Sequence, residues 1–235
     1  EYVVQGASRW IDRLGTKDMI LKGDSEPALQ EVNESIAETR ASKTHIRATP
    51  KESKGSLGLA ENCNDMLGGP MRCLLIDLER LAGVKVRRGH VLAAWLVRHS
   101  GWQHFRFQRG ADGKTGYGRL FGRDYLHPTL CFGEAAEFKL RGKLAAKGEK
   151  RWSSGIYVGK DEESDEFLFL TENGVELARS VQRRPISTRF DKSLLEKVVG
   201  TPWNPKALRG HKVSSGTDTS CLSYGERHER TRALC

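Results

Sequence analysis

The sequence predicts a mixed α/β fold in which helices and one strand are followed by a small β-barrel of SH3-like type. Over the first 125 residues, apolar side chains recur mainly at steps of three and four, which is the spacing of one helix face. From residue 128 the pattern changes to short apolar runs separated by turn residues, which is typical of strands. After residue 186 the apolar pattern fades, which indicates a linker and a disordered tail. We therefore expect three parts, over residues 1–125, 128–186 and 187–235.

Each element follows from its local pattern. The expected helices cover residues 1–15, 26–40, 59–82 and 90–108, and the expected strands cover residues 18–23, 130–140, 152–159, 166–171 and 174–182. Asp24 or Ser25 suits the N-cap of the second helix, and Pro27 suits its first turn, where the missing N–H is not needed. The sequence Gly68-Gly69-Pro70 predicts a kink or two shorter helices, because a proline in a helix interior costs about 3 kcal/mol.

Two further segments are more ambiguous. Residues 41–58 are polar and basic with almost no apolar side chains, which predicts an irregular connection. Gly113-Lys114-Thr115 would fit a phosphate-binding loop only with a glycine five residues before Gly113, and Gln108 stands there. We therefore exclude a phosphate-binding loop. His99 and His104 lie among apolar residues of the 90–108 helix, where a structural histidine is more common than a metal ligand.

Charge and cysteine use restrict the class of protein. The 235 residues carry a net charge of +9, which favours a polyanionic partner, either nucleic acid or an anionic membrane surface. The five cysteines form no C-x-x-C pair, which argues against a disulfide framework and a cysteine-ligated zinc site. The sequence has no apolar run near the roughly 20 residues of a membrane span and no signal-peptide pattern. We therefore expect an intracellular protein without a membrane partner.

Two carboxylates stand where they could share a cation. Asp24 follows the strand over 18–23, and Glu61 stands near the start of the helix over 59–82. Hard cations such as Mg²⁺ bind oxygen ligands, so carboxylates at neighbouring element ends can hold one jointly. On the residues alone, the simpler interpretations are a helix cap for Asp24 and a first-turn carboxylate for Glu61, favoured by the helix dipole.

Several strings of the sequence occur in the same order in a known family. In chain order they are Met19-Ile20-Leu21-Lys22-Gly23-Asp24-Ser25-Glu26-Pro27-Ala28-Leu29, Ser56-Leu57-Gly58-Leu59-Ala60-Glu61, Phe132-Gly133-Glu134, Arg151-Trp152 with Gly155 and Gly159, and Ala178-Arg179-Ser180-Val181 with Arg183. Over roughly residues 1–190, the chain resembles the integrase of copia-like retrotransposon polyproteins, which are related to retroviral Pol polyproteins.

The resemblance implies a ribonuclease-H-like core that integrates DNA by metal-dependent phosphoryl transfer, with Mg²⁺ or Mn²⁺ as cofactor. It implies that Asp24 and Glu61 are catalytic metal ligands, matching the second and third of the family's three carboxylates. The first, which the family places on the opening strand of its sheet, has no match in this sequence. We therefore expect an N-terminally truncated, incomplete core with little or no strand-transfer activity.

The basic side chains predict where DNA would bind. In the resembling family, the segment matching 41–58 lies beside the active site, where basic residues would meet phosphates. The alternative is a solvated loop. The expected nucleic-acid contacts are Lys43, Arg47, Lys51, Lys54, Arg141, Lys143, Lys147, Lys150 and Arg151. The resemblance also implies a homo-oligomer on DNA and a nuclear location. The alternative function is a non-catalytic nucleic-acid-binding remnant of an integrase, and a decayed insertion without function is a third interpretation.

Overall fold

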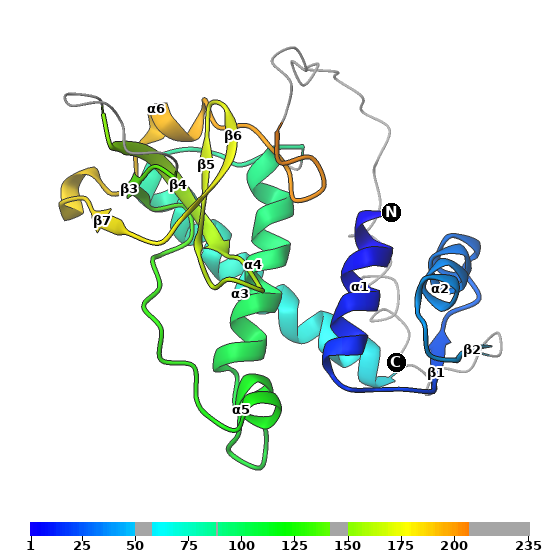
Figure 1. The fold of residues 1–235 in the computed structure, drawn as a ribbon. Coiled ribbons are helices and arrows are strands. Elements are labelled where there is room, and N and C mark those ends of the chain that lie inside the picture. Colours follow the sequence, from blue (N-terminus) through cyan, green and yellow to red (C-terminus); the bar gives the residue numbers. More distant parts are fainter. Residues whose placement is uncertain (50–57, 88, 142–149, 207–235) are drawn as a thin grey trace, which may run out of the picture.

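The chain forms a mixed α/β structure in which a small N-terminal unit lies beside a larger helix-and-sheet unit (Figure 1). The computed structural model describes residues 1–49, 58–87, 89–141 and 150–206. The N-terminal unit comprises α1 (Tyr2–Arg13), β1 (Met19–Gly23), α2 (Pro27–Thr39) and β2 (Thr44–Ala48). The larger unit comprises α3 (Gly58–Ala82), α4 (Val91–Phe107), α5 (Gly116–Phe121), β3 (Ala135–Lys139), β4 (Trp152–Lys160), β5 (Phe167–Thr171), β6 (Gly174–Ala178), β7 (Val181–Arg183), the 3₁₀ turn η1 (Ile186–Thr188) and α6 (Lys192–Leu195).

Parallel pairing of β1 with β2 is the framework of the N-terminal unit, and Gly23 lies opposite Ala48 in this pair. The helix α2 makes the crossover that parallel strands require. A Cβ atom built at Gly23 would lie 2.5 Å from Asn33 Nδ2, so a larger residue here would displace the Asn33 side chain of α2. β2 falls within 41–58, so the predicted irregular connection is wrong for this stretch. Four of its five residues are exposed, and it therefore lacks the apolar alternation that marks a strand.

The ends of α1 and α2 follow from local sequence. Gly15, directly after the C-cap residue Leu14, adopts a φ of +72°, which glycine reaches without steric strain. Pro27 is the first residue of α2, as predicted. The predicted N-cap is wrong, because Glu26 occupies that position and its side chain makes no capping hydrogen bond.

The helix α3 continues through Gly68-Gly69-Pro70 as a single element, so the predicted alternative of two shorter helices is wrong. Pro70 is exposed, and a Cβ atom at Gly69 would meet nothing within 4 Å, so this turn makes no clash with neighbouring elements. The local loss of helix stability is offset by tertiary packing, because Leu78 belongs to the main core cluster and Leu74 and Leu75 pack against it.

Residues 135–183 form a five-stranded antiparallel sheet with the strand order β6-β5-β4-β3-β7. The predicted SH3-like barrel is wrong in that the sheet stays open: within the described ranges, its edge strands β6 and β7 do not pair. The predicted strand over 174–182 is divided, because the chain turns after Ala178 and joins the opposite edge at Val181. In this connection, the carbonyl oxygen of Ser180 accepts a hydrogen bond from the Lys139 N–H at 3.0 Å.

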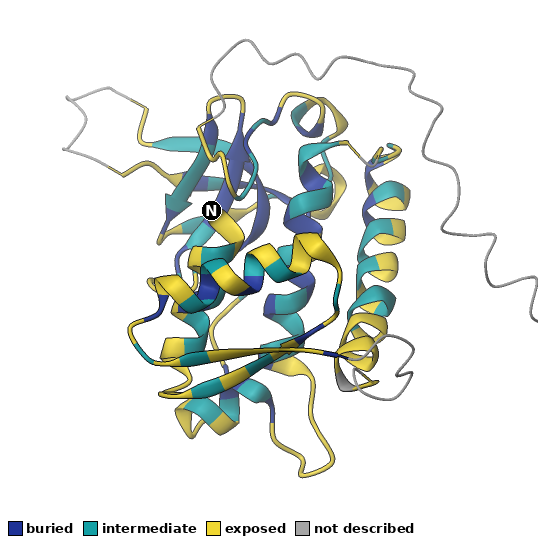
Figure 2. Cartoon of the chain, turned by 90° about the vertical axis from the view of Figure 1, so that its right-hand side faces the viewer, coloured by how far each residue is buried: buried dark blue, intermediate teal, exposed yellow. Residues whose placement is uncertain are grey.

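Alternate residues of the sheet belong to two core clusters. Ile156 and Leu170 pack with Leu78 and Trp95 of the helices, and the second cluster gathers Phe138, Tyr157 and Phe169 with neighbouring residues. Figure 2 shows buried residues concentrated in the sheet and in the helix behind it, whereas the N-terminal unit is mostly intermediate or exposed. The stable core of the molecule therefore lies in the larger unit.

Residues 187–206 complete this core. Leu195 and Val198 are buried in the main cluster, and Trp95 Nε1 donates a hydrogen bond to the carbonyl oxygen of Gly200 at 2.9 Å. The predicted linker is therefore wrong as far as residue 206. Residues 187–206 contain too few apolar residues to form a periodic pattern, but these residues pack against the core that the helices and the sheet form. The disordered tail is predicted over residues 206–235, and residues 207–235 lie outside the described residues.

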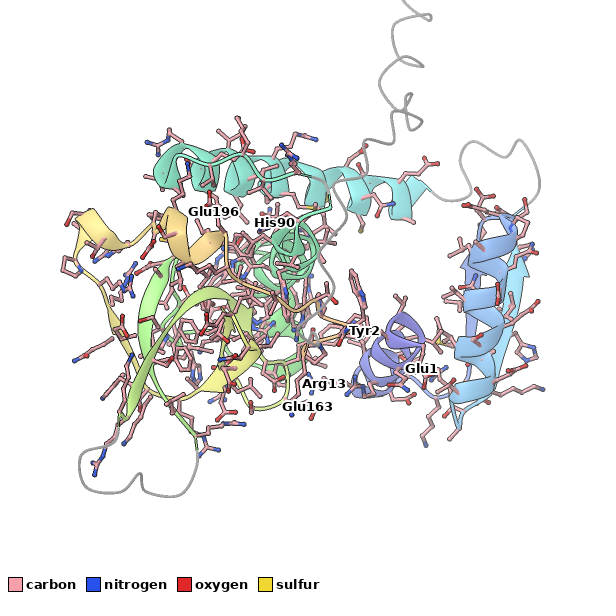
Figure 3. The ribbon with its side chains drawn as sticks, turned by 90° about the horizontal axis from the view of Figure 1, so that it is seen from above. Glu1, Tyr2, Arg13, His90, Glu163 and Glu196 are labelled. Carbon is pink, nitrogen blue, oxygen red and sulfur yellow. The ribbon has the colours of Figure 1, made fainter. Side chains whose placement is uncertain are left out.

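Contacts of α1 connect the two units. Trp10 meets Phe105 of α4 edge to face, with ring centroids 4.8 Å apart. Arg9 forms an ion pair with Glu163 at 3.4 Å, and Arg13 donates a hydrogen bond to the carbonyl oxygen of Glu162 at 3.2 Å. Both acceptors lie in the turn between β4 and β5, and Figure 3 shows Arg13 beside Glu163 at this boundary.

Candidate metal and nucleic-acid sites

The C-terminal ends of β1 and β2 define the place of the candidate metal site. Because the strands are parallel, these ends lie at one edge of the pair. The Thr49 N–H donates a hydrogen bond to the carbonyl oxygen of Gly23 at 2.9 Å, so the chain leaves β2 beside the residue that precedes Asp24. Figures 1 and 3 show that α3 begins on the side of the N-terminal unit.

The two predicted metal ligands are both exposed. Asp24 Oδ1 accepts a hydrogen bond from the backbone N–H of Ser25 at 2.7 Å. Glu61 stands in the first turn of α3, where the helix dipole favours a negative charge. Within the described parts of the chain, neither carboxylate forms an ion pair and no direct contact joins them. Both are therefore accessible to a cation from solvent.

The described residues contain no group of three or more His, Cys, Asp and Glu side chains arranged to hold a metal ion. Asp24 and Glu61 would therefore act as a pair. Carboxylate oxygens suit Mg²⁺ or Mn²⁺, and Mg²⁺ is commonly bound through one or two carboxylates together with water and substrate phosphates. The donor chemistry fits such an ion, with part of its coordination left to groups outside the protein.

The first group of predicted nucleic-acid contacts belongs to β2. Arg47 lies in β2 and Lys43 lies directly before it, and both are exposed; the two-residue period of a strand places Arg47 on one face with His45. The Lys43 N–H donates to Asp18 Oδ1 at 3.2 Å, which fixes the chain just before β2. The predicted contacts Lys51 and Lys54 lie outside the described residues.

Arg40, which sequence reasoning missed, holds the N-terminal unit together. Its guanidinium is fully buried and binds the Asp12 carboxylate at 3.0 Å and the Thr44 hydroxyl at 2.6 Å. It also donates to the carbonyl oxygens of Thr16 and Lys17, at 2.8 and 3.1 Å. These bonds join the end of α2 to α1, to the turn before β1 and to the start of β2. Arg40 therefore positions the strand pair on which the Asp24 edge depends.

The second group of predicted contacts lies at the β3–β4 hairpin. Arg141, Lys150 and Arg151 are exposed, and Arg141 forms an ion pair with Glu166. The predicted contacts Lys143 and Lys147 lie outside the described residues. Figures 1 and 3 show the hairpin at the opposite end of the molecule from the β1–β2 pair. The described residues of the two groups therefore do not form one continuous surface.

Two carboxylates, one fully buried and one partly exposed, hold arginines along the β7 edge of the sheet. Glu134 is fully buried and accepts hydrogen bonds from Arg183 Nε and Nη2, at 2.8 and 2.6 Å. The hydrogen bond with Glu134 raises the pKa of Arg183 above its usual value. Glu137 accepts from Arg184 Nη2 at 2.7 Å. Glu134 and Arg183 belong to strings that carry the family resemblance, and in this structure they form a pair that fixes β7 to the segment before β3.

His99 lies in the core of the larger unit, packed against aromatic rings. It is 1% exposed, and its ring lies 5.2 Å from the ring of Phe132 and 5.6 Å from that of Trp102. Neither ring nitrogen has a hydrogen-bond partner among the described residues. Burial lowers the pKa of His99 to about 4, so the ring is neutral at pH 7.

Comparison with known proteins identifies no relative: no family model, curated protein or solved structure matches the chain. In the part of the chain that the structure describes, no helix has the length and apolar character needed to cross a membrane. The function of the chain therefore has to be inferred from its own residues and geometry.

Proposed function

We propose that the chain is a retroelement integrase-like protein that binds DNA and holds a divalent cation between Asp24 and Glu61. The observation that carries the proposal is the parallel β1–β2 pair, with Asp24 directly after β1 and Glu61 in the first turn of the helix that follows β2. This order of elements is the one expected for part of a ribonuclease-H-like core. It consists of a strand followed by a carboxylate, a crossover helix, a parallel strand, and a helix with a glutamate in its first turn. Its sequence strings are those that resemble the integrases.

In this proposal, Asp24 and Glu61 bind the cation through carboxylate oxygens, and neither acts as a general base. A bound Mg²⁺ or Mn²⁺ would polarise a phosphodiester and stabilise the charge that develops on its oxygens. Lys43 and Arg47 would hold neighbouring DNA phosphates, which positions the backbone without reading its sequence. Two carboxylates are fewer than the family's three, so we expect weak cation binding and little or no strand transfer.

A second candidate function is DNA binding without catalysis. The absence of a cluster of three or more metal-ligating side chains among the described residues favours it. The net charge of +9 supports DNA binding under either proposal. In both cases the affinity should fall steeply as salt rises, because phosphate contacts release counterions. The two candidates differ in whether a cation binds to Asp24 and Glu61.

Calorimetric titration with Mn²⁺ separates the two functions. The full chain would be compared with Asp24→Asn and Glu61→Gln, and with Glu34→Gln as a matched control, because Glu34 is an exposed carboxylate on α2. Loss of binding in the first two variants but not in the control supports a shared cation site. Absence of Mn²⁺ binding in all four proteins refutes the cation site, and DNA binding measured without metal would then support the non-catalytic candidate.

A strand-transfer assay tests the expected lack of activity. Purified chain is incubated with labelled DNA ends in Mg²⁺ or Mn²⁺, with Asp24→Asn alongside. The expected result is no joined product from either protein. Joining by the wild-type chain that is lost in Asp24→Asn would show that two carboxylates are sufficient, and our expectation of inactivity would then be wrong.

A further inference from the structure

Two arginines share one buried carboxylate where the β3–β4 hairpin meets the β6–β7 connection. Glu166 is 3% exposed, and its Oε1 accepts a hydrogen bond from Arg179 Nε at 2.8 Å. Its Oε2 forms an ion pair with Arg141 and accepts a hydrogen bond from the Ser164 hydroxyl at 3.0 Å. The side chains of Arg179 and Arg141 are nevertheless 83% and 51% exposed. One buried anchor therefore holds two guanidinium groups at the surface.

This anchoring leaves donors available for a ligand. Arg179 contacts Glu166 through Nε, and its two terminal nitrogens have no partner among the described residues. A guanidinium presents five N–H donors in a planar fork that matches the oxygens of a phosphate. Glu166 neutralises one of the two positive charges, so the three side chains keep a net charge of +1. Because the guanidinium groups are already held in place, less side-chain freedom is lost when a phosphate binds.

More cations lie in the segments beside the pair. The Lys139 N–H donates to the carbonyl oxygen of Ser180, and the Leu140 N–H donates to that of Arg151, both at 3.0 Å. These bonds join the end of β3 to the residue after Arg179 and to the start of the β4 segment. Lys139, Lys150 and Arg151 are exposed, and none of them forms an ion pair within the described residues. Positive charge is therefore distributed along three adjacent segments.

We propose that Arg141 and Arg179 clamp a phosphodiester of a nucleic-acid backbone, with Glu166 as the positioning residue. The proposal rests on the DNA binding proposed above and adds a defined subsite to it. A ligand with regularly repeated negative charges fits this arrangement, because the surrounding cations are distributed along the surface. The clamp contacts phosphate oxygens only, so it should not distinguish one DNA sequence from another.

The test measures binding of a fluorescently labelled DNA duplex to the full chain by anisotropy over a range of salt concentrations. Arg179→Gln should weaken binding and reduce the slope of log K against log salt by about 1, which is the expected effect of one lost phosphate contact. Arg80→Gln is the matched control, because Arg80 is an exposed arginine on α3 that also pairs with a carboxylate. The control should leave the salt slope unchanged.

Glu166→Gln distinguishes positioning from simple charge. Removal of a negative charge would by itself strengthen binding of a polyanion, whereas loss of the anchor should weaken it. We expect weaker binding, with thermal unfolding confirming that the variant is folded. Tighter binding by folded Glu166→Gln would overturn the positioning role. Equal salt slopes for Arg179→Gln and Arg80→Gln would overturn the clamp while leaving the proposed DNA binding intact. Absence of DNA binding by the wild-type chain would refute the proposed DNA binding, and the clamp with it.

Discussion

Acidification should destabilise the protein through His99. An unfolded histidine titrates near pH 6.5, whereas burial lowers the pKa of His99 in the folded chain to about 4. Between these values the unfolded chain binds a proton that the folded chain does not accept. The stabilising contribution of neutral, buried His99 is therefore complete above about pH 6.5, and it is lost progressively as the pH falls towards 4.

The size of the effect follows from the two pKa values. The complete shift corresponds to about 3 kcal/mol of unfolding free energy, and the part that develops between pH 7 and pH 5 is about 2 kcal/mol. Because His99 is 1% exposed, solvent does little to screen this term. Burial also lowers the pKa of His90, which adds a contribution of the same sign.

Urea unfolding at pH 7 and pH 5 measures this contribution. His99→Leu should remove most of the decline in unfolding free energy, because leucine fills the apolar site without a titrating group. His45→Leu is the control, since His45 is exposed on β2, and it should keep the wild-type decline. If His99→Leu lost as much stability as the wild-type chain between the two pH values, the assignment of the pH dependence to His99 would be refuted.

Four further substitutions, one of them a matched control, test which residues stabilise the fold, each by thermal or urea unfolding. Arg40→Gln should cost about 2–3 kcal/mol, because it leaves buried acceptors without their charged donor, and an unchanged midpoint would contradict the central role of Arg40. Gly133→Ala should cost about 1–3 kcal/mol, because φ is +79° and the added Cβ would overlap Leu78; Gly69→Ala, with open space around it, should be neutral or stabilising. Pro70→Ala should stabilise the chain by up to about 3 kcal/mol, because it restores a backbone donor inside α3, and a loss of stability would show that the proline shapes the helix.

Elements with strong local periodicity could be predicted closely from the sequence. The helices α1, α2 and α4 match their expected ranges within two residues at both ends, because an apolar stripe and a terminal glycine or proline are local signals. β2 could not be found in this way, because its stability comes from pairing with β1 and from the Arg40–Thr44 hydrogen bond. Both β1 and Arg40 lie outside β2, so the residues of β2 alone do not predict the strand.

Long-range arrangement explains the other differences. The pattern over 174–182 indicates β-structure, but the position of β7 at the opposite edge depends on the turn at Arg179 and Ser180 and on pairing with β3. The structural roles of Arg40 and Glu166 cannot be predicted from the sequence for the same reason, since their ion-pair partners are distant in sequence. The positions of Asp24 and Glu61 at element ends could be predicted, whereas the distribution of the basic residues between two ends of the molecule required the fold.

The N-terminal unit buries few apolar side chains, and this should lower its apparent affinity for a ligand. Among the described residues of this unit, Ile36 is the one apolar side chain in the buried core, and the other buried positions are polar residues and Gly23. Local opening of β1 and β2 therefore exposes little apolar surface, and their amide protons should exchange with solvent much faster than those of β4 and β5. A cation or a DNA strand that binds at the Asp24 edge would select the ordered conformation from this fluctuating population. Its apparent affinity would then include the free energy of closing the unit, and slower amide exchange in β1 and β2 would report binding without any assay of catalysis.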